Sequence, residues 1–160
     1  MFSLFKKKKE ISIVAPMTGE IFEIDKVPDE VFAGKMVGDG LAIKPSEGIV
    51  VAPCSGKVIQ VFPTNHAMGI LTPEGVEILI HIGLDTVNLK GNGFKSFVQA
   101  GDDVNKGDKL LEVDLEYVIE NAKSIISPVI VTNMEKVLSL SIEKGTVQKG
   151  IDNIMDIELK

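Results

Sequence analysis

The chain has 160 residues, of which 44% are hydrophobic and 25% charged, and its net charge is −6. This composition is typical of a globular protein and predicts one domain with a substantial core. All 17 basic residues are lysines, so this acidic chain is a poor candidate for nucleic-acid binding, and a basic protein partner is favoured. No apolar run reaches the roughly 18 residues of a membrane span, and the single cysteine, Cys54, excludes an internal disulfide.

The N-terminal residues 1–10 read M-F-S-L-F-K-K-K-K-E. One interpretation is a weak membrane contact through residues 1–9, with apolar side chains in the interface and lysines near anionic lipid. The simpler interpretation is a solvated, frayed end. We therefore expect a flexible tail at 1–10 and one domain at 11–160.

From residue 11 onward, short β-rich runs alternate with Gly, Pro and Asp, which is typical of an antiparallel sandwich or barrel. We expect an all-β fold, an antiparallel β-sandwich with one or two short helices. Only 115–126 shows helical periodicity, with Pro128 after it. The expected strands are 11–15, 20–24, 40–44, 49–52, 57–62, 67–71, 76–82, 109–114, 129–131 and 153–159.

A faint internal repeat joins V-A-P-M-T-G-E-I at 14–21 to V-A-P-C-S-G-K-V at 51–58, at an offset of 37 residues. Two similar β units packed face to face would produce it, and so would chance similarity between turns. Each Pro-x-x-Gly is expected to shape a strand exit, with its glycine at positive φ.

The only two histidines, His66 and His81, lie in the apolar segment 64–87. Turn residues at Pro73-Glu74-Gly75 predict a β-hairpin. A turn centred between Pro73 and Glu74 would place the imidazoles opposite each other on one face of the sheet. Two-residue and four-residue loops keep this register, whereas a bulged three-residue loop would not. A slip of one residue would send the rings to opposite faces.

An imidazole becomes chemically useful when a hydrogen bond fixes one nitrogen and leaves the other free. Thr64 precedes His66 by two residues, and Gly83 follows His81 by two, so each ring has an orienting neighbour. Such a pair suits phosphoryl carriage, zinc ligation or general base catalysis. General base catalysis would need a serine or cysteine motif, and zinc catalysis a motif such as H-E-x-x-H, but neither accompanies the pair. Phosphoryl carriage therefore needs the fewest additional residues. The alternative is that the two histidines are partly buried side chains with their hydrogen bonds satisfied and no chemical function.

Other residues could surround the histidines. The apolar candidates form either ordinary core or a docking ring, and two carboxylates, Asp29 and Asp85, would anchor a basic partner. The apolar candidates are Val31, Phe32, Val37, Phe62, Leu79 and Val87.

The segment G-V-E-I-L-I-H-I-G-L-D-T-V at 75–87 is highly specific, and it occurs with T-N-H-A at 64–67, V-F-A-G-K-M-V-G-D-G-L-A-I-K-P at 31–45 and L-K-G-N-G-F at 89–94. With these segments the chain closely resembles the glucose-class enzyme IIA of the bacterial phosphoenolpyruvate-dependent sugar phosphotransferase system. The resemblance runs from about residue 11 to the C-terminus. It implies a cytoplasmic β-sandwich of the duplicated hybrid-motif type.

The resemblance also implies roles for individual residues. His81 would take a phosphoryl group from the phosphocarrier HPr and pass it to a cysteine on a IIB domain of a glucose-type sugar permease, in sugar uptake and its regulation. His66 would stabilise the transferred group, with Thr64 hydrogen-bonded to it. No cofactor is required, and zinc would bind His66 and His81 only where a partner adds a carboxylate. Free and permease-fused versions exist, and Met1 and the chain length suggest a free one.

The docking residues follow from the same resemblance. Phe32, Phe62 and Leu79 would belong to the apolar ring, although Leu79 stands where some relatives have an aromatic residue. Asp29 and Asp85 would face the basic surface of HPr.

Two other classes remain as alternatives. V-N-K-G-D-K-L-L-E-V at 104–113 and the two A-P-x-x-G segments also resemble biotinyl or lipoyl carrier domains. The candidate lysines, at Asp25-Lys26 and Lys35-Met36, lack the expected flanks, and the chain is much longer than such a module. A zinc-dependent β-rich hydrolase is the third interpretation, but the paired H-x-H ligands are missing.

Overall fold

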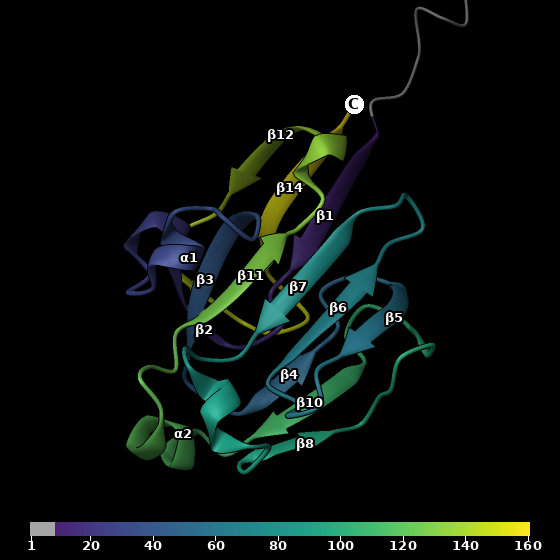
Figure 1. Cartoon of the computed structure of the whole chain (residues 1–160). Coiled ribbons are helices and arrows are strands. Elements are labelled where there is room, and N and C mark those ends of the chain that lie inside the picture. Colours follow the sequence, from purple (N-terminus) through teal and green to yellow (C-terminus); the bar gives the residue numbers. More distant parts are fainter. Residues whose placement is uncertain (1–8) are drawn as a thin grey trace, which may run out of the picture.

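Antiparallel strands are the main regular structure of residues 9–160, the part of the chain that the computed structural model describes (Figure 1). One sheet has eight strands in the order β13-β2-β3-β11-β7-β6-β5-β9, and two three-stranded sheets have the orders β1-β14-β12 and β4-β10-β8. The strands are β1 Glu10–Val14, β2 Gly19–Glu23, β3 Asp39–Pro45, β4 Ile49–Val51, β5 Gly56–Val61, β6 Ala67–Leu71, β7 Glu77–His81, β8 Phe94–Ser96, β9 Asp103–Val104, β10 Lys109–Val113, β11 Ser127–Val131, β12 Val137–Ile142, β13 Thr146–Val147 and β14 Asn153–Leu159.

The helices of the described residues are short. The α-helices are α1 Glu30–Ala33 and α2 Leu115–Asn121, and the 3-10 helices are η2 Ile24–Lys26, η3 Thr86–Leu89 and η4 Met134–Lys136. No helix among residues 9–160 is long and apolar enough to cross a membrane.

The core lies between the sheets, where alternate strand residues point inward. In β7, for example, Ile78 and Ile80 are buried while Glu77, Leu79 and His81 on the other face are partly exposed. The largest fully buried side chains are Ile13, Met17, Leu41, Ile43, Met68, Ile70, Ile78, Ile80, Ile82, Leu84, Leu110 and Leu111. The predicted all-β antiparallel fold with short helices is confirmed.

The internal repeat has a structural counterpart. In each copy a strand ends at the valine, and the next strand begins at the glycine. The two copies bind each other reciprocally: the Val14 N–H donates to the Pro53 carbonyl at 3.0 Å, and the Val51 N–H donates to the Pro16 carbonyl at 2.7 Å. Because equivalent atoms pair in both directions, the repeat is a duplicated β unit rather than a chance similarity of turns.

The glycines of the repeat serve a different purpose from the predicted one. Neither Gly19 nor Gly56 has positive φ. A Cβ atom at Gly19 would lie 2.1 Å from the Lys44 carbonyl oxygen, and one at Gly56 would lie 2.3 Å from the Leu71 carbonyl oxygen. The absence of a side chain therefore permits close strand approach, and the expectation of positive φ is wrong.

The single cysteine is part of this duplicated core. Cys54 occupies the position in the second copy that Met17 has in the first, and both side chains are buried. Burial raises the pKa of the Cys54 thiol to about 12, so the thiol stays protonated and packs as a small apolar group.

Some elements differ from those predicted. The sequence pattern does not predict β8, β9 or β13, which are too short for alternation to show. The strand β12 is also missing from the expected strands, although its sequence V-L-S-L-S-I alternates between apolar and polar residues. The helix α2 ends at Asn121 instead of 126, because the following segment pairs with the loop after β7 through a bridge between Ser124 and Leu84.

The start of the chain is described only from Lys9. The Lys9 carbonyl accepts a hydrogen bond from the Leu159 N–H at 2.8 Å, and Glu10, placed in the tail by the sequence, already pairs with Glu158. This pairing brings the start of β1 next to the C-terminus (Figure 1). The predicted membrane contact of residues 1–9 lies, apart from Lys9, outside the described residues and stays a prediction.

Candidate phosphoryl-transfer site

His81 is the last residue of β7, which lies beside β6 and β11 near the middle of the large sheet (Figure 1). Its side chain is on the partly exposed face of β7, together with Glu77 and Leu79. The strand therefore holds the backbone of His81 rigidly while leaving part of its ring accessible.

His66 comes from the loop between β5 and β6. The Asn65 N–H donates to the Phe62 carbonyl at 2.7 Å, and the Phe62 N–H donates to the Ala67 carbonyl at 2.9 Å, which closes a tight turn. Pro63 suits the second position of such a turn, and Asn65 has φ 58°, a conformation that asparagine tolerates better than most residues. His66 follows this turn and is only 4% exposed.

The predicted register of the hairpin is wrong by one residue. Ala67, and not His66, pairs with His81. The hairpin has a three-residue loop with Gly75 at φ +92°, and the Gly75 N–H donates to the Thr72 carbonyl at 2.9 Å. This loop is of the bulged kind that shifts the register.

The two rings nevertheless meet. The ring centroids of His66 and His81 lie 5.0 Å apart, and the ring planes make an angle of 81°. His66 precedes β6 and follows the left-handed Asn65, so the alternation of the strand does not set the direction of its side chain. The prediction that the histidines are adjacent is therefore confirmed, for a reason other than the one given.

Each ring is bound to the protein through Nδ1. The Nδ1 of His81 lies 2.8 Å from the Gly83 carbonyl oxygen. A carbonyl only accepts, so Nδ1 carries the proton, and Nε2 of the neutral ring holds a free lone pair. The Nδ1 of His66 is hydrogen-bonded to the Thr64 hydroxyl, which can donate or accept. When Thr64 donates, the His66 Nε2 carries the proton and becomes a donor.

Both imidazoles favour the neutral form. Burial, with a smaller contribution from the neighbouring His81, lowers the pKa of His66 from 6.5 to about 4. Burial also lowers the pKa of His81, against the opposing effects of the Gly83 carbonyl and the Asp29 and Asp85 carboxylates. At pH 7 one neutral ring thus has a nucleophilic nitrogen beside a second neutral ring.

We expect the free energy of unfolding to fall as the pH is lowered from 6.5 toward 4. The pKa of His66 is lower in the folded chain than in the unfolded chain, so between these two values only the unfolded chain binds the proton. The contribution of His66 to the free energy of unfolding is therefore fully present above the unfolded pKa and is lost as the pH falls. The slope attributable to His66 approaches about 1.4 kcal/mol per pH unit. Urea unfolding of the wild type and of His66→Gln between pH 7 and pH 5 measures it. The variant should show a flatter dependence, and equal slopes would contradict the lowered pKa.

Two aromatic rings flank the histidines. The Phe32 ring centroid lies 4.9 Å from that of His81, and the Phe62 centroid lies 5.4 Å from that of His66. Phe32 is buried in a small apolar cluster, separate from the main core, against which Val37 and Leu79 also pack. These contacts hold the imidazoles in place and shield one side of them from water.

Other apolar residues near the site face solvent. Val31 is 45% exposed and Val87, in η3, is 52% exposed. Met36 is 76% exposed and its N–H donates to the Val31 carbonyl at 3.0 Å, so it lies next to that valine. Met36 was not predicted as a site residue, and a lone methionine in a glycine-rich segment gives no sequence signal of exposure. Of the six predicted apolar residues, Phe32 is thus buried, Val37, Phe62 and Leu79 are partly exposed, and Val31 and Val87 are exposed.

The two predicted carboxylates occupy different settings. Asp29 caps α1, because its carboxylate accepts from the Val31 N–H at 2.9 Å and the Phe32 N–H at 3.4 Å. Asp85 is exposed at φ 58° and leads into η3. Both carboxylates act electrostatically on His81 and favour its charged form.

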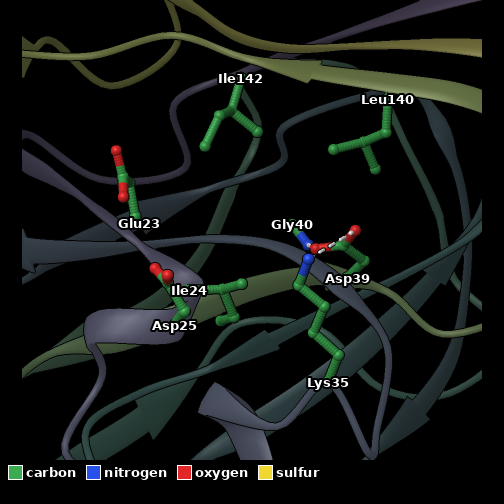
Figure 2. A pocket seen from close by; sticks show the side chains of 8 residues that line it. All are labelled: Glu23, Ile24, Asp25, Lys35, Asp39, Gly40, Leu140 and Ile142. Carbon is green, nitrogen blue, oxygen red and sulfur yellow. Dashed lines mark hydrogen bonds and ion pairs between the residues drawn. The ribbon is translucent and has the colours of Figure 1, made fainter.

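A separate hollow of about 280 Å³ lies between β2, β3 and β12. Figure 2 shows its carboxylates, Glu23, Asp25 and Asp39, with a single lysine, Lys35, which is 3.6 Å from Asp39. This excess of negative charge disfavours a phosphoryl group, and none of the predicted site residues lines the hollow. The histidine pair is therefore the better candidate site.

A family model described as phosphoenolpyruvate-dependent sugar phosphotransferase system, EIIA 1, matches residues 11–137. The chain belongs to this family. It is 52% identical over 159 residues to the PTS system glucose-specific EIIA component of Staphylococcus epidermidis, with 96% of each chain covered. It is 47% identical over 161 residues to the protein of that name from Bacillus anthracis, with 100% of this chain and 98% of the relative covered.

A solved structure agrees with these relatives. The glucose permease IIA from Mycoplasma capricolum matches with a TM-score of 0.88 and 49% identity, covering 92% of this chain and 96% of that one. These findings confirm the predicted fold class and the prediction of a phosphotransferase component that carries phosphoryl groups in sugar uptake. They decide against the biotinyl or lipoyl carrier and the zinc hydrolase.

Proposed function

We propose that this EIIA 1 family member is a cytoplasmic phosphoryl carrier whose acceptor atom is Nε2 of His81. One observation carries the assignment. The Gly83 carbonyl fixes the proton on Nδ1, which leaves the Nε2 lone pair on a partly exposed ring beside a second imidazole. His66 is less suitable as the acceptor, because it is almost fully buried.

The transfer is a displacement at phosphorus. The Nε2 lone pair of His81 forms the new N–P bond while the bond from phosphorus to the donor breaks, and that electron pair leaves with the donor. The His81 ring gains positive character, which strengthens the Nδ1–H bond to the Gly83 carbonyl. A thiolate on the acceptor then attacks phosphorus, and the N–P electron pair returns to Nε2. His81 ends neutral and ready for the next cycle.

His66 has the supporting role. With the Thr64 hydroxyl donating to Nδ1, the His66 Nε2 carries a proton, and this N–H would donate to an oxygen of a phosphoryl group on the neighbouring His81 ring, 5.0 Å away between centroids. The lowered pKa of His66 keeps this donor neutral, so it stabilises the group without binding it as tightly as a cation would. Loose binding suits a phosphoryl group that must be transferred to the next protein.

The partners in this proposal are HPr as the donor and a IIB domain of a glucose-type sugar permease as the acceptor. The apolar residues of the site would meet the partner, and Asp29 and Asp85 would face basic groups on HPr. Those apolar residues are Val31, Phe32, Val37, Phe62, Leu79 and Val87. Exposed Val31 and Val87 are better placed for direct contact than Phe32, whose burial gives it a supporting position.

Removing the Asp85 charge is expected to slow association with HPr. Asp85→Asn retains a residue that tolerates positive φ, and Asp85→Lys reverses the charge at a conformation that Lys35 and Lys90 also adopt in this chain. The association rate constant should fall about threefold and about tenfold respectively at about 0.01 M ionic strength. At about 1 M, where the screening length is about 3 Å, both variants should approach the wild type. Stopped-flow binding measures these rates.

Asp103→Asn is the matched control, since Asp103 lies in β9 at the edge of the large sheet and is exposed. It should leave the rate nearly unchanged. A defect of Asp85→Lys that persists at high salt would indicate local misfolding rather than lost attraction.

Zinc enters this proposal only at a partner interface. Among residues 9–160 no group of three His, Cys, Asp or Glu side chains could hold a metal ion. The two imidazoles supply two nitrogens of the kind that zinc binds, so a partner would have to add the missing carboxylate. Bound there, zinc would add affinity between the two proteins.

The relay itself is tested by reconstitution with phosphoenolpyruvate, enzyme I, HPr and an isolated IIB domain. We expect phosphoryl label on the IIB cysteine only when this chain is present. Equal labelling of IIB in the absence of the chain would contradict the proposal.

A further inference from the structure

The peptide group that fixes His81 is itself held by the segment that leads into β11. The Gly83 carbonyl accepts from His81, and the Leu84 N–H of the same peptide group donates to the Ser124 carbonyl at 2.9 Å. On the other side, the Gly83 N–H donates to the Ser127 hydroxyl oxygen at 3.0 Å. Gly83 is thus bound from both directions, although it lies beyond the end of β7.

Ser127 is well suited to be the anchor. It is fully buried, at 0% exposure, and its hydroxyl donates to the Ile125 carbonyl at 2.8 Å while accepting from Gly83. Because both functions of the hydroxyl are used, its orientation is fixed. Ser127 begins β11, which pairs with β3 on one side and β7 on the other, so the anchor stands on a rigid central strand.

The anchored residue needs such support. Gly83 has φ +71°, and a Cβ atom there would lie 2.6 Å from Thr86 Cγ2 and 2.7 Å from the Ser124 carbonyl oxygen, so glycine is required. Glycine is also the residue with the greatest backbone freedom. Without the hydrogen bond on its N–H, Gly83 could rotate about its φ and ψ and turn its carbonyl away from His81, and the imidazole would then exchange between its two neutral tautomers.

We propose that Ser127 is a positioning residue for His81: its hydroxyl holds Gly83 so that the Gly83 carbonyl keeps the proton on Nδ1 and leaves Nε2 free. The inference rests on the proposed role of His81 as the acceptor. The Ser127 hydroxyl is hydrogen-bonded to Gly83 and Ile125, so it acts on His81 through Gly83. Loss of the Ser127 hydroxyl should therefore lower the rate constant of phosphorylation at saturating HPr and leave the apparent affinity for HPr unchanged.

The test compares two buried hydroxyls at opposite ends of β7. Ser127→Ala removes the one that binds the Gly83 N–H. Thr72→Val is the matched control, because Thr72 is only 3% exposed and its hydroxyl accepts from the Val76 N–H at 3.1 Å just before β7 begins. Both variants lose one buried hydrogen bond to a backbone N–H, but only the first loss is next to His81.

The measurement is long-range ¹H–¹⁵N NMR of the unphosphorylated protein, which reports the tautomer of His81. We expect the Nδ1–H tautomer in the wild type and in Thr72→Val. In Ser127→Ala the ratio of Nδ1–H to Nε2–H should fall about fivefold, the effect of about one ordinary hydrogen bond. An unchanged ratio in Ser127→Ala would overturn the inference while leaving phosphorylation of His81 untouched. Phosphoryl label on another residue would overturn the proposed function whatever the tautomer.

Discussion

Replacement of His81 by glutamine is expected to abolish phosphoryl incorporation from HPr, by a factor of at least about 10³. The amide keeps the polarity of the position and can still reach the Gly83 carbonyl, but it has no nitrogen lone pair basic enough to attack phosphorus. His66 does not take over, because it is buried and its Nδ1 is bound to Thr64. Labelling with radioactive phosphoenolpyruvate in the presence of enzyme I and HPr measures the loss.

His66→Gln is the matched control for this experiment, since it makes the same substitution on the neighbouring ring. It should still accept the phosphoryl group. Full labelling of His81→Gln would place the acceptor elsewhere, provided that circular dichroism shows both variants to be folded.

The second large effect is expected in onward transfer from His66→Gln. The phosphoryl group on His81 should pass to IIB about 10² to 10³ times more slowly than in the wild type, the usual result of losing one donor to a developing negative charge. The glutamine amide can donate one hydrogen bond, but it lacks the aromatic packing against Phe62 that orients the His66 ring. Rapid-quench measurement of phosphoryl loss from the pre-labelled protein gives the rate.

A second variant separates the donor from its orientation. Thr64→Val keeps both imidazoles and removes only the hydroxyl that binds the His66 Nδ1. Its onward transfer should be slowed less than that of His66→Gln. Transfer at the wild-type rate in His66→Gln would refute the supporting role of His66.

Much of the fold could be predicted from local sequence, because alternation and turn residues express the two faces of each strand directly. The bounds of β6 and β14 follow from the pattern alone. The helix α1 could not be predicted, since its four residues are too few for helical periodicity, and its formation depends on the Asp29 cap. The end of α2 at Asn121 could not be predicted from the local pattern either, because the segment after it forms a bridge between Ser124 and the distant Leu84.

The residues of the site could be predicted from the sequence better than their arrangement in space. Two histidines on neighbouring segments suggested a pair, and they do form one. The register, however, depends on whether the loop at Gly75 has three residues or an even number, and the sequence permits both. The sequence also did not predict that the Gly83 carbonyl binds His81. A glycine in a sequence indicates only that no side chain is present, whereas Gly83 acts through its backbone oxygen.

The proposed acceptor of the phosphoryl group is a single atom, Nε2 of His81. Protein labelled with ¹⁵N in its histidines is phosphorylated with phosphoenolpyruvate, enzyme I and HPr, and ¹⁵N–³¹P coupling is recorded by NMR. We expect phosphorus bonded to Nε2 of His81, with Nδ1 still protonated. Phosphorus on Nδ1 of His81, or on His66, would contradict it.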